Sequence, residues 1–118
     1  MLTEVQFLDR YIFQGLTDLN DGFDAVGIPY FTREEFHIVL QRIQFFGCGI
    51  YGIEPFLEGS FYAVEVHELN GDDPYDPEWF WRVFKEFCQE QEGLQYSASY
   101  CIPEFLLFNP PLLEDGQH

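Results

Sequence analysis

The sequence predicts an α+β fold, in which three helices pack on one face of a small, mainly antiparallel sheet of about three or more strands. Apolar residues switch between helical and alternating spacing, and the segments follow the order helix, helix, strand, strand, helix, strand. Of the 118 residues, 47% are hydrophobic and 19% aromatic, which is enough for one core. We therefore expect a single globular domain over residues 1–118, ending in a proline-broken tail over residues 103–118.

Two helices are predicted in the first part of the chain. Apolar residues at helical spacing from Val5 to Leu19 predict a helix over residues 4–19, and Thr3 can cap its start. A capping-box pattern predicts a second helix, in which Thr32 accepts from helix amides and Glu35 reaches back. Its apolar stripe and the glycine that can end it are Phe36, Val39, Leu40, Ile43 and Gly47.

The middle of the chain predicts a β-hairpin. Residues 47–59 are glycine-rich but favour strand, and residues 60–69 alternate so that Tyr62, Val64 and Val66 share one face. The segment Leu57 to Gly59 lies near the expected turn.

A third helix is predicted over residues 77–91, because Asp76 and Pro77 match an N-cap followed by proline at the first helical position. Gly93 ends this segment, and alternation from Gln95 to Ile102 then predicts a half-exposed strand. The tail is apolar but interrupted by prolines, so we expect it to be irregular or extended. The core face of the third helix is Phe80, Val83, Phe84 and Phe87.

The charge of the chain is strongly acidic. It has 21 Asp and Glu against 5 Lys and Arg, a net charge of −16, whereas solubility needs only about 2–8 charges in a small domain. Two stretches without any basic residue, 43–81 and 86–118, carry 14 of the 21 acids. Such a field repels nucleic acid and anionic membranes and attracts a basic partner. We expect a basic protein partner and no direct binding to nucleic acid or membrane.

No cofactor, metal or catalytic motif is visible. Cys48, Cys88 and Cys101 are far apart and in no metal-binding or redox spacing, which favours buried thiols. Glu65 and His67 share a strand face, but one pair is too few ligands for a metal site. The glycines at positions 47–52 match no phosphate-binding pattern.

The start of the chain lacks the pattern of a secretory signal, and no apolar run reaches the roughly 18–20 residues of a membrane span. The expected localisation is therefore cytoplasmic.

The candidate binding surface is the acidic segment that precedes the third helix. Glu68, Asp72, Asp73 and Asp76 surround a single tyrosine, Tyr75, with no basic residue between them. Asp76 already has a structural role as a helix cap, whereas Asp72, Asp73 and Tyr75 have none that the sequence reveals. A proline-flanked acidic loop with one aromatic residue suits recognition of Lys and Arg on a partner.

Trp81 is the remaining candidate for this surface. It lies about 200° round the third helix from Trp79, away from the phenylalanine stripe, where it could serve as an exposed anchor. Burial under its neighbouring strand or under the tail is the alternative.

The stretches FFGCGIYGIEPFLEGSFYAVEVHE and DPYDPEWFWRVFKEF, in an acidic α+β chain without catalytic motifs, resemble the immunity proteins of contact-dependent inhibition and related bacterial polymorphic toxin systems. The resemblance is one of general character and carries no signature motif. It implies a toxin inhibitor that binds a cognate toxin, commonly a nuclease, and occludes its basic active-site surface.

Two other functions are compatible with the sequence. The first is a nucleic-acid mimic that inhibits a DNA-binding, restriction or CRISPR protein. The second is a small enzyme that uses Cys48 as a nucleophile or the pair Glu54 and Glu58 as acid and base, although the absence of a motif favours a protein that is not an enzyme.

Overall fold

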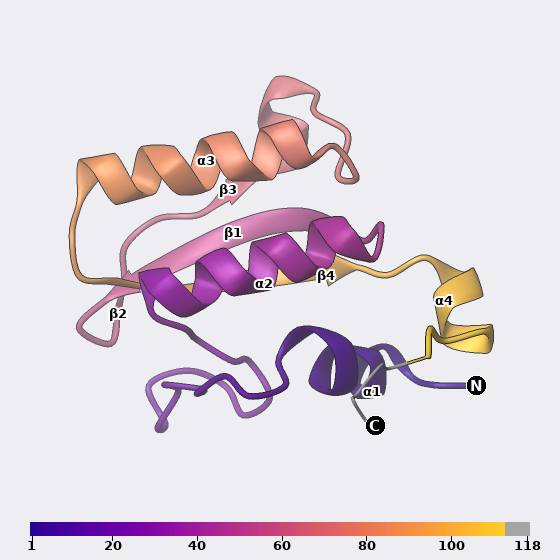
Figure 1. The fold of residues 1–118 in the computed structure, drawn as a ribbon. Coiled ribbons are helices and arrows are strands. Elements are labelled where there is room, and N and C mark those ends of the chain that lie inside the picture. The colour runs from indigo at the N-terminus through magenta and orange to yellow at the C-terminus, as the bar shows by residue number, and fades with distance from the viewer. Residues whose placement is uncertain (113–118) are drawn as a thin grey trace.

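The computed structural model describes residues 1–112 and has an α+β fold, which confirms the predicted class (Figure 1). The first α-helix is shorter than the predicted one, and the short α-helix over residues 104–108 was not predicted. In chain order the elements are α1 (Glu4–Phe7), the π-helix η1 (Leu8–Ile12), α2 (Arg33–Phe45), β1 (Gly49–Leu57), β2 (Ser60–Phe61), β3 (Glu65–Val66), the 3₁₀ helix η2 (His67–Asn70), α3 (Pro77–Glu90), β4 (Leu94–Cys101) and α4 (Glu104–Phe108).

The sheet is antiparallel throughout and is built around β1. Strand β4 pairs with β1 from Leu57↔Leu94 to Gly49↔Cys101, and a bulge between Ile50 and Gly52 leaves Tyr51 as the extra residue. Strands β2 and β3 share the other side of β1. The sheet therefore has β4 along one edge.

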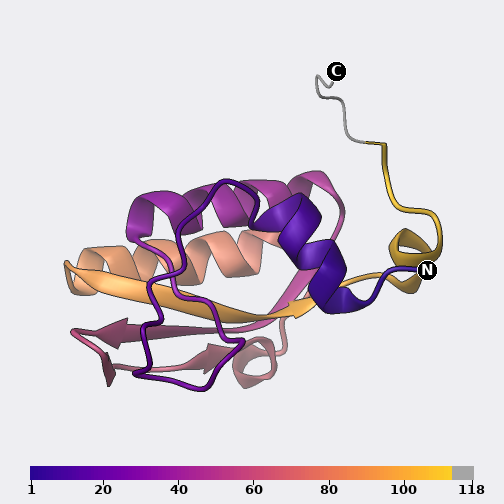
Figure 2. The same ribbon diagram turned by 90° about the horizontal axis from the view of Figure 1, so that it is seen from below.

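Helices α2 and α3 form a layer over one face of this sheet (Figure 2). Phe36 of α2 is fully buried and stacks on Tyr96 of β4, with ring centroids 5.3 Å apart, while Phe84 of α3 meets the same tyrosine edge-on at 5.0 Å. The segment between η1 and α2 passes round the β4 edge, and its Phe23 packs on Phe56 of β1. The core therefore lies between the helices and the sheet.

The first helix is shorter than predicted. Thr3 caps it, since the Gln6 amide donates to the Thr3 hydroxyl at 3.1 Å, but the helical segment ends at Ile12 instead of residue 19. Arg42 of α2 donates to the carbonyls of Ile12 and Gln14, both at 2.8 Å, and so satisfies groups at the end of the helix. A turn follows in place of further helix, in which the Leu16 amide donates to the Phe13 carbonyl at 3.0 Å.

Helix α2 begins at the predicted cap, although only half of the capping box forms. The Glu35 amide donates to the Thr32 hydroxyl at 3.1 Å. The Glu35 carboxylate, however, accepts from the backbone N–H of Thr17 at 2.8 Å and does not reach back to residue 32. It therefore fastens the preceding loop to α2.

The predicted hairpin is present, but its second strand is divided. Glu58 and Gly59 form the turn with φ of 52° and 80°. Pro55 has no N–H for the ladder, and its carbonyl accepts from both Tyr62 and Ala63, at 3.1 and 3.5 Å. This irregularity separates β2 from β3, so residues 60–69 do not form one strand.

Helix α3 and strand β4 agree with the prediction to within one residue. Asp76 caps α3 by accepting from the Glu78 amide at 3.0 Å, and Pro77 is the first helical residue. The tail differs from the prediction, because residues 104–108 form α4, with Leu106 and Leu107 buried. The last six residues of the predicted tail, 113–118, lie outside the described part of the chain.

Three tyrosines, Tyr30, Tyr96 and Tyr100, predict a loss of stability at alkaline pH. Burial is the largest cause that raises the pKa of each hydroxyl above its usual value of about 10. The unfolded chain therefore releases these protons first as the pH rises. We expect the contribution of these tyrosines to the free energy of unfolding, measured with urea, to be constant up to about pH 10 and then to fall.

The variant Tyr100→Phe tests this expectation. The Tyr100 hydroxyl oxygen is buried and has no hydrogen-bond partner within residues 1–112, so its removal deletes a titrating group without breaking a hydrogen bond. The variant should match the parent protein at neutral pH and lose less stability above about pH 10. An alkaline loss as large as that of the parent protein would contradict the role of Tyr100.

Candidate partner-binding surface

The acidic loop, residues 68–76, links β3 to α3 and is held in place at both ends. The Asp72 amide donates to the carbonyl of His67 at 2.9 Å, and the His67 ring lies 2.8 Å from the Asp72 carbonyl oxygen. The carbonyl of Pro74 accepts from the backbone N–H of Ile50 in β1 at 2.9 Å. The loop thus continues the edge of the sheet beyond β3 and has a fixed shape.

Two of the predicted site carboxylates are bound to α3. Asp72 forms an ion pair with Arg82 of α3 at 3.0 Å, and its side chain is only 21% exposed. The expectation that Asp72 has no structural role was therefore wrong, because the sequence could not show that α3 brings Arg82 to it. Asp76 is engaged as the cap of α3.

Glu68 and Asp73 remain the carboxylates of the loop that face solvent. Both residues are exposed, and the Glu68 side chain makes no hydrogen bond within residues 1–112. One oxygen of Asp73 accepts from the Tyr75 amide at 2.9 Å, which fixes the side chain while its second oxygen stays available. These two residues could contact a cation on a partner.

Tyr75 is an exposed but restrained aromatic residue. Its ring is 43% exposed, and the Cys101 thiol donates to its hydroxyl at 3.0 Å. The neighbouring Cys101, together with burial, raises the pKa of Tyr75 to about 12, so the hydroxyl is neutral at physiological pH. A restrained ring loses little conformational entropy when a partner binds, which is typical of a binding hot spot.

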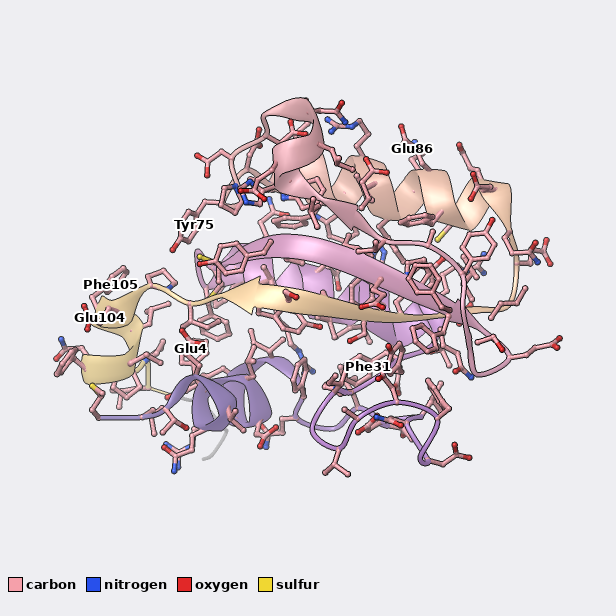
Figure 3. The ribbon with its side chains drawn as sticks, turned by 180° about the vertical axis from the view of Figure 1, so that it is seen from behind. Glu4, Phe31, Tyr75, Glu86, Glu104 and Phe105 are labelled. Atoms are coloured by element: carbon pink, nitrogen blue, oxygen red, sulfur yellow. The ribbon has the colours of Figure 1, made fainter. Side chains whose placement is uncertain are left out.

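Further aromatic residues lie at the same end of the molecule. Tyr51 is 45% exposed, and the same Cys101 thiol raises its pKa. Phe105 of α4 is 64% exposed, and Figure 3 shows it at this end with Tyr75, Glu4 and Glu104, whereas Glu86 projects from the far part of α3. We call Tyr51, Tyr75 and Phe105, with the acidic loop, the aromatic–acidic surface.

Sequence reasoning missed Tyr51 and Phe105. Tyr51 is the bulged residue of β1, and regular alternation does not reveal a bulge. For Phe105 a signal was present: Pro103 followed by Glu104 is typical of a helix start. A helix there places Leu106 and Leu107 in the core and leaves Phe105 outside.

Trp81 is not part of this surface. It lies between α3 and α2, where its indole N–H donates to the side-chain oxygen of Gln44 at 2.8 Å and its ring meets His37 edge-on at 4.9 Å. The ring is partly buried and packs against the core. Trp81 therefore joins the two helices, and α2, not a strand or the tail, covers it.

The groups named for an enzyme do not form a catalytic arrangement. Cys48 is buried. Its burial, and to a lesser extent the neighbouring Cys101, raises its pKa to about 12, so the thiol stays protonated at neutral pH. Glu54 pairs with Ser97 in the middle of the sheet, whereas Glu58 is in the hairpin turn. They are four positions apart, which is about 13 Å along an extended strand and more than the spacing of paired catalytic carboxylates.

The glycine-rich segment serves close packing. A Cβ atom at Gly49 would lie 2.7 Å from the Pro74 carbonyl oxygen, and one at Gly52 would lie 3.0 Å from a methyl of Val66. These contacts bring β1 against β3 and the acidic loop. In the part of the chain that the structure describes, no three His, Cys, Asp or Glu side chains converge as metal ligands.

Most acidic side chains lack a basic partner. Within residues 1–112 the structure contains two salt bridges, Arg33 with Glu34 and Arg82 with Asp72. Arg42 is used on backbone carbonyls. The excess negative charge therefore faces solvent.

None of the helices in residues 1–112 has the length and apolar content of a membrane span. No protein-family model, no curated protein and no solved structure matches this chain. The fold and the aromatic–acidic surface are the observations from which a function can be proposed.

Proposed function

We propose that this chain is an immunity protein of the bacterial cytoplasm, which neutralises a cognate toxin, a nuclease, by covering its basic active-site surface. One observation carries the proposal: the exposed carboxylates of Glu68 and Asp73, which form no ion pair within residues 1–112, lie in one loop with the exposed and hydrogen-bonded Tyr75 on a folded domain. The protein would act by binding and would use no cofactor.

The charge supports fast encounter with such a partner. A nuclease binds phosphates and therefore presents Lys and Arg around its active site. A net charge of −16 repels nucleic acid but attracts that basic surface, which raises the association rate at low salt. Glu68 and Asp73 are the loop carboxylates free to make these contacts.

The aromatic rings support affinity after encounter. Arg side chains stack on tyrosine rings, and an exposed contact of this kind contributes about 0.5–1 kcal/mol, rising when water is excluded. Tyr75 is held by the Cys101 thiol, and the Tyr51 ring packs near the His67 ring with centroids 5.9 Å apart, so both rings have fixed neighbours before binding. The acidic loop would therefore supply steering and the rings the buried contact.

Charge reversal tests the mechanism with a toxin encoded next to this gene. We expect Glu68→Lys to lower the association rate by about tenfold at low salt, and the difference should shrink at high salt. The matched control is Glu86→Lys, which makes the same charge change on an exposed residue of α3 away from the surface (Figure 3). Surface plasmon resonance at two salt concentrations measures both rates.

Three further variants separate the effect of charge from that of loop structure. Asp73→Asn keeps an oxygen that can accept from the Tyr75 amide while it removes the charge, and Tyr75→Phe keeps the ring while it removes the hydroxyl. Asp73→Asn should slow association, whereas Tyr75→Ala should speed dissociation and Tyr75→Phe should retain most of the affinity. If Glu86→Lys weakens binding as much as Glu68→Lys, or if salt has no effect, the proposed surface is wrong.

A further inference from the structure

Strand β4 has an unpaired edge. Tyr96 exchanges both backbone hydrogen bonds with Phe31, at 2.9 and 2.8 Å, so its N–H and C=O point away from β1. Because backbone groups alternate along a strand, those of Ala98 and Tyr100 point to the same side. The partners of Tyr96 and Tyr100 in β1 agree with this: Pro55 has no N–H, and the Ile50 N–H donates to Pro74 instead.

Beyond Tyr96 this edge has no pairing strand. Within residues 1–112 the N–H and C=O groups of Ala98 and Tyr100 make no hydrogen bond on that side. Within residues 1–112 the segment before α2 pairs with β4 only at Phe31. An open edge of this kind can accept an added strand.

A pocket of about 530 Å³ adjoins the open edge. Ala98 and Tyr100 line it from β4, Leu8 and Phe13 from η1 and the residue after it, and Ile28 from the loop before α2. The volume is sufficient for a long side chain together with its backbone. A strand added to β4 would therefore have a place for its side chains.

The rim of this pocket is acidic. Asp9 and Asp18 line it, and no lining residue is basic. One Asp18 oxygen accepts from the amides of Asn20 and Tyr30, at 2.8 and 3.0 Å, so this carboxylate is held in position. Apolar walls below carboxylates suit a side chain with an aliphatic stem and a cationic end, as in Arg and Lys.

The π-helix shapes the same pocket. A straight helix was predicted here, but η1 widens the turn at residues 8–12, where Tyr11 and Ile12 are buried while Leu8 and Asp9 line the pocket. π-helical turns are rare in proteins, and those that occur are often found at functional sites. The departure from regular helix therefore coincides with the pocket and the open edge.

We propose that the edge of β4 from Ala98 to Tyr100 binds an extended segment of a protein partner and that the pocket takes a basic side chain of that segment. Main-chain hydrogen bonds to β4 supply affinity, and alternate side chains of the segment meet the pocket, where Asp9 and Asp18 select a cation. This site shares with the proposed immunity function only the basic character of the partner.

A peptide titration tests the site in the absence of any toxin. The probe is acetyl-Val-Arg-Val-Arg-Val-amide, followed by amide chemical shifts and hydrogen exchange of the ¹⁵N-labelled protein. We expect shifts and slower exchange at Ala98 and Tyr100. Replacement of both Arg by Glu, or N-methylation of the peptide amides that face the edge, should weaken binding at least about tenfold, because each removes one kind of contact.

Variants of the protein separate the two contacts. Asp9→Asn should weaken the affinity for the Arg peptide about two- to fivefold, the usual effect of losing one exposed ion pair. Glu86→Gln removes the same charge elsewhere and should leave this affinity unchanged. Ala98→Pro removes an unpaired N–H and blocks the edge, and its thermal melting curve shows whether the fold is retained.

Three outcomes would overturn the site: equal binding of the Glu peptide, shifts confined to residues 68–76, or protection of Ala98 by self-association of the free protein. None of these outcomes involves toxin binding, so they would reject the β4 site without rejecting the proposed function. Loss of toxin binding by Glu68→Lys likewise says nothing of the β4 edge.

Discussion

Replacement of Phe36 by alanine is expected to lower the free energy of unfolding by about 3–5 kcal/mol, the usual cost of deleting a buried aromatic ring. Phe36 is fully buried and packs against the rings of both Tyr96 and Phe84, with centroid distances of 5.3 and 5.4 Å. Its loss would leave a cavity where α2, α3 and β4 meet. Denaturant unfolding, followed by circular dichroism, measures the change.

The same helix offers a matched control for this effect. Phe45 is also on α2, but its side chain is 81% exposed. Phe45→Ala should change the free energy of unfolding by no more than about 0.5 kcal/mol, as is usual for a surface position. Similar losses for the two variants would show that the core does not lie between the helices and the sheet.

Gly49→Ala is expected to destabilise the fold by about 1–3 kcal/mol and to displace the acidic loop, because the site has no space for a methyl group. The added Cβ would lie 2.7 Å from the Pro74 carbonyl oxygen and 3.1 Å from the Tyr75 ring. The carbonyl is itself bonded to the Ile50 N–H. The loop can therefore move only by giving up that hydrogen bond.

Gly52→Ala provides a graded comparison. Its closest contact is a Val66 methyl at 3.0 Å, and a side chain can adjust more readily than a backbone carbonyl. Gly52→Ala should therefore cost less and leave the loop in place. Amide chemical shifts of residues 72–76 distinguish the two variants. Unchanged loop shifts in Gly49→Ala would mean that the loop does not rest on β1.

The sequence correctly predicted the ends of those helices and strands that are set by residues close by in the chain. The cap at Asp76 with Pro77, the cap at Thr32, and the hairpin turn at Glu58 and Gly59 are all present. Each depends on residues within one turn of chain, so their geometry is encoded locally. Distant contacts decided the rest.

The differences arise where a distant group satisfies the backbone. Arg42 binds carbonyls thirty residues earlier and so helps to end the first helical segment at Ile12. Pro55 divides the second strand of the hairpin through its carbonyl. The sequence correctly grouped the candidate binding residues of the acidic loop. It did not show that Asp72 pairs with Arg82 or that Trp81 lies against α2. Hydrophobic periodicity contains no information about such partners.

The open edge of β4 also bears on aggregation. An unpaired strand edge is a template on which copies of the same chain can assemble. At neutral pH, copies of this protein repel one another through a net charge of −16 each, while a basic segment is attracted to the same edge. Near the isoelectric point of about 4.1 that repulsion vanishes, and the edge is left without electrostatic protection. The acidity that favours a foreign basic partner thus also serves to keep the protein from joining itself.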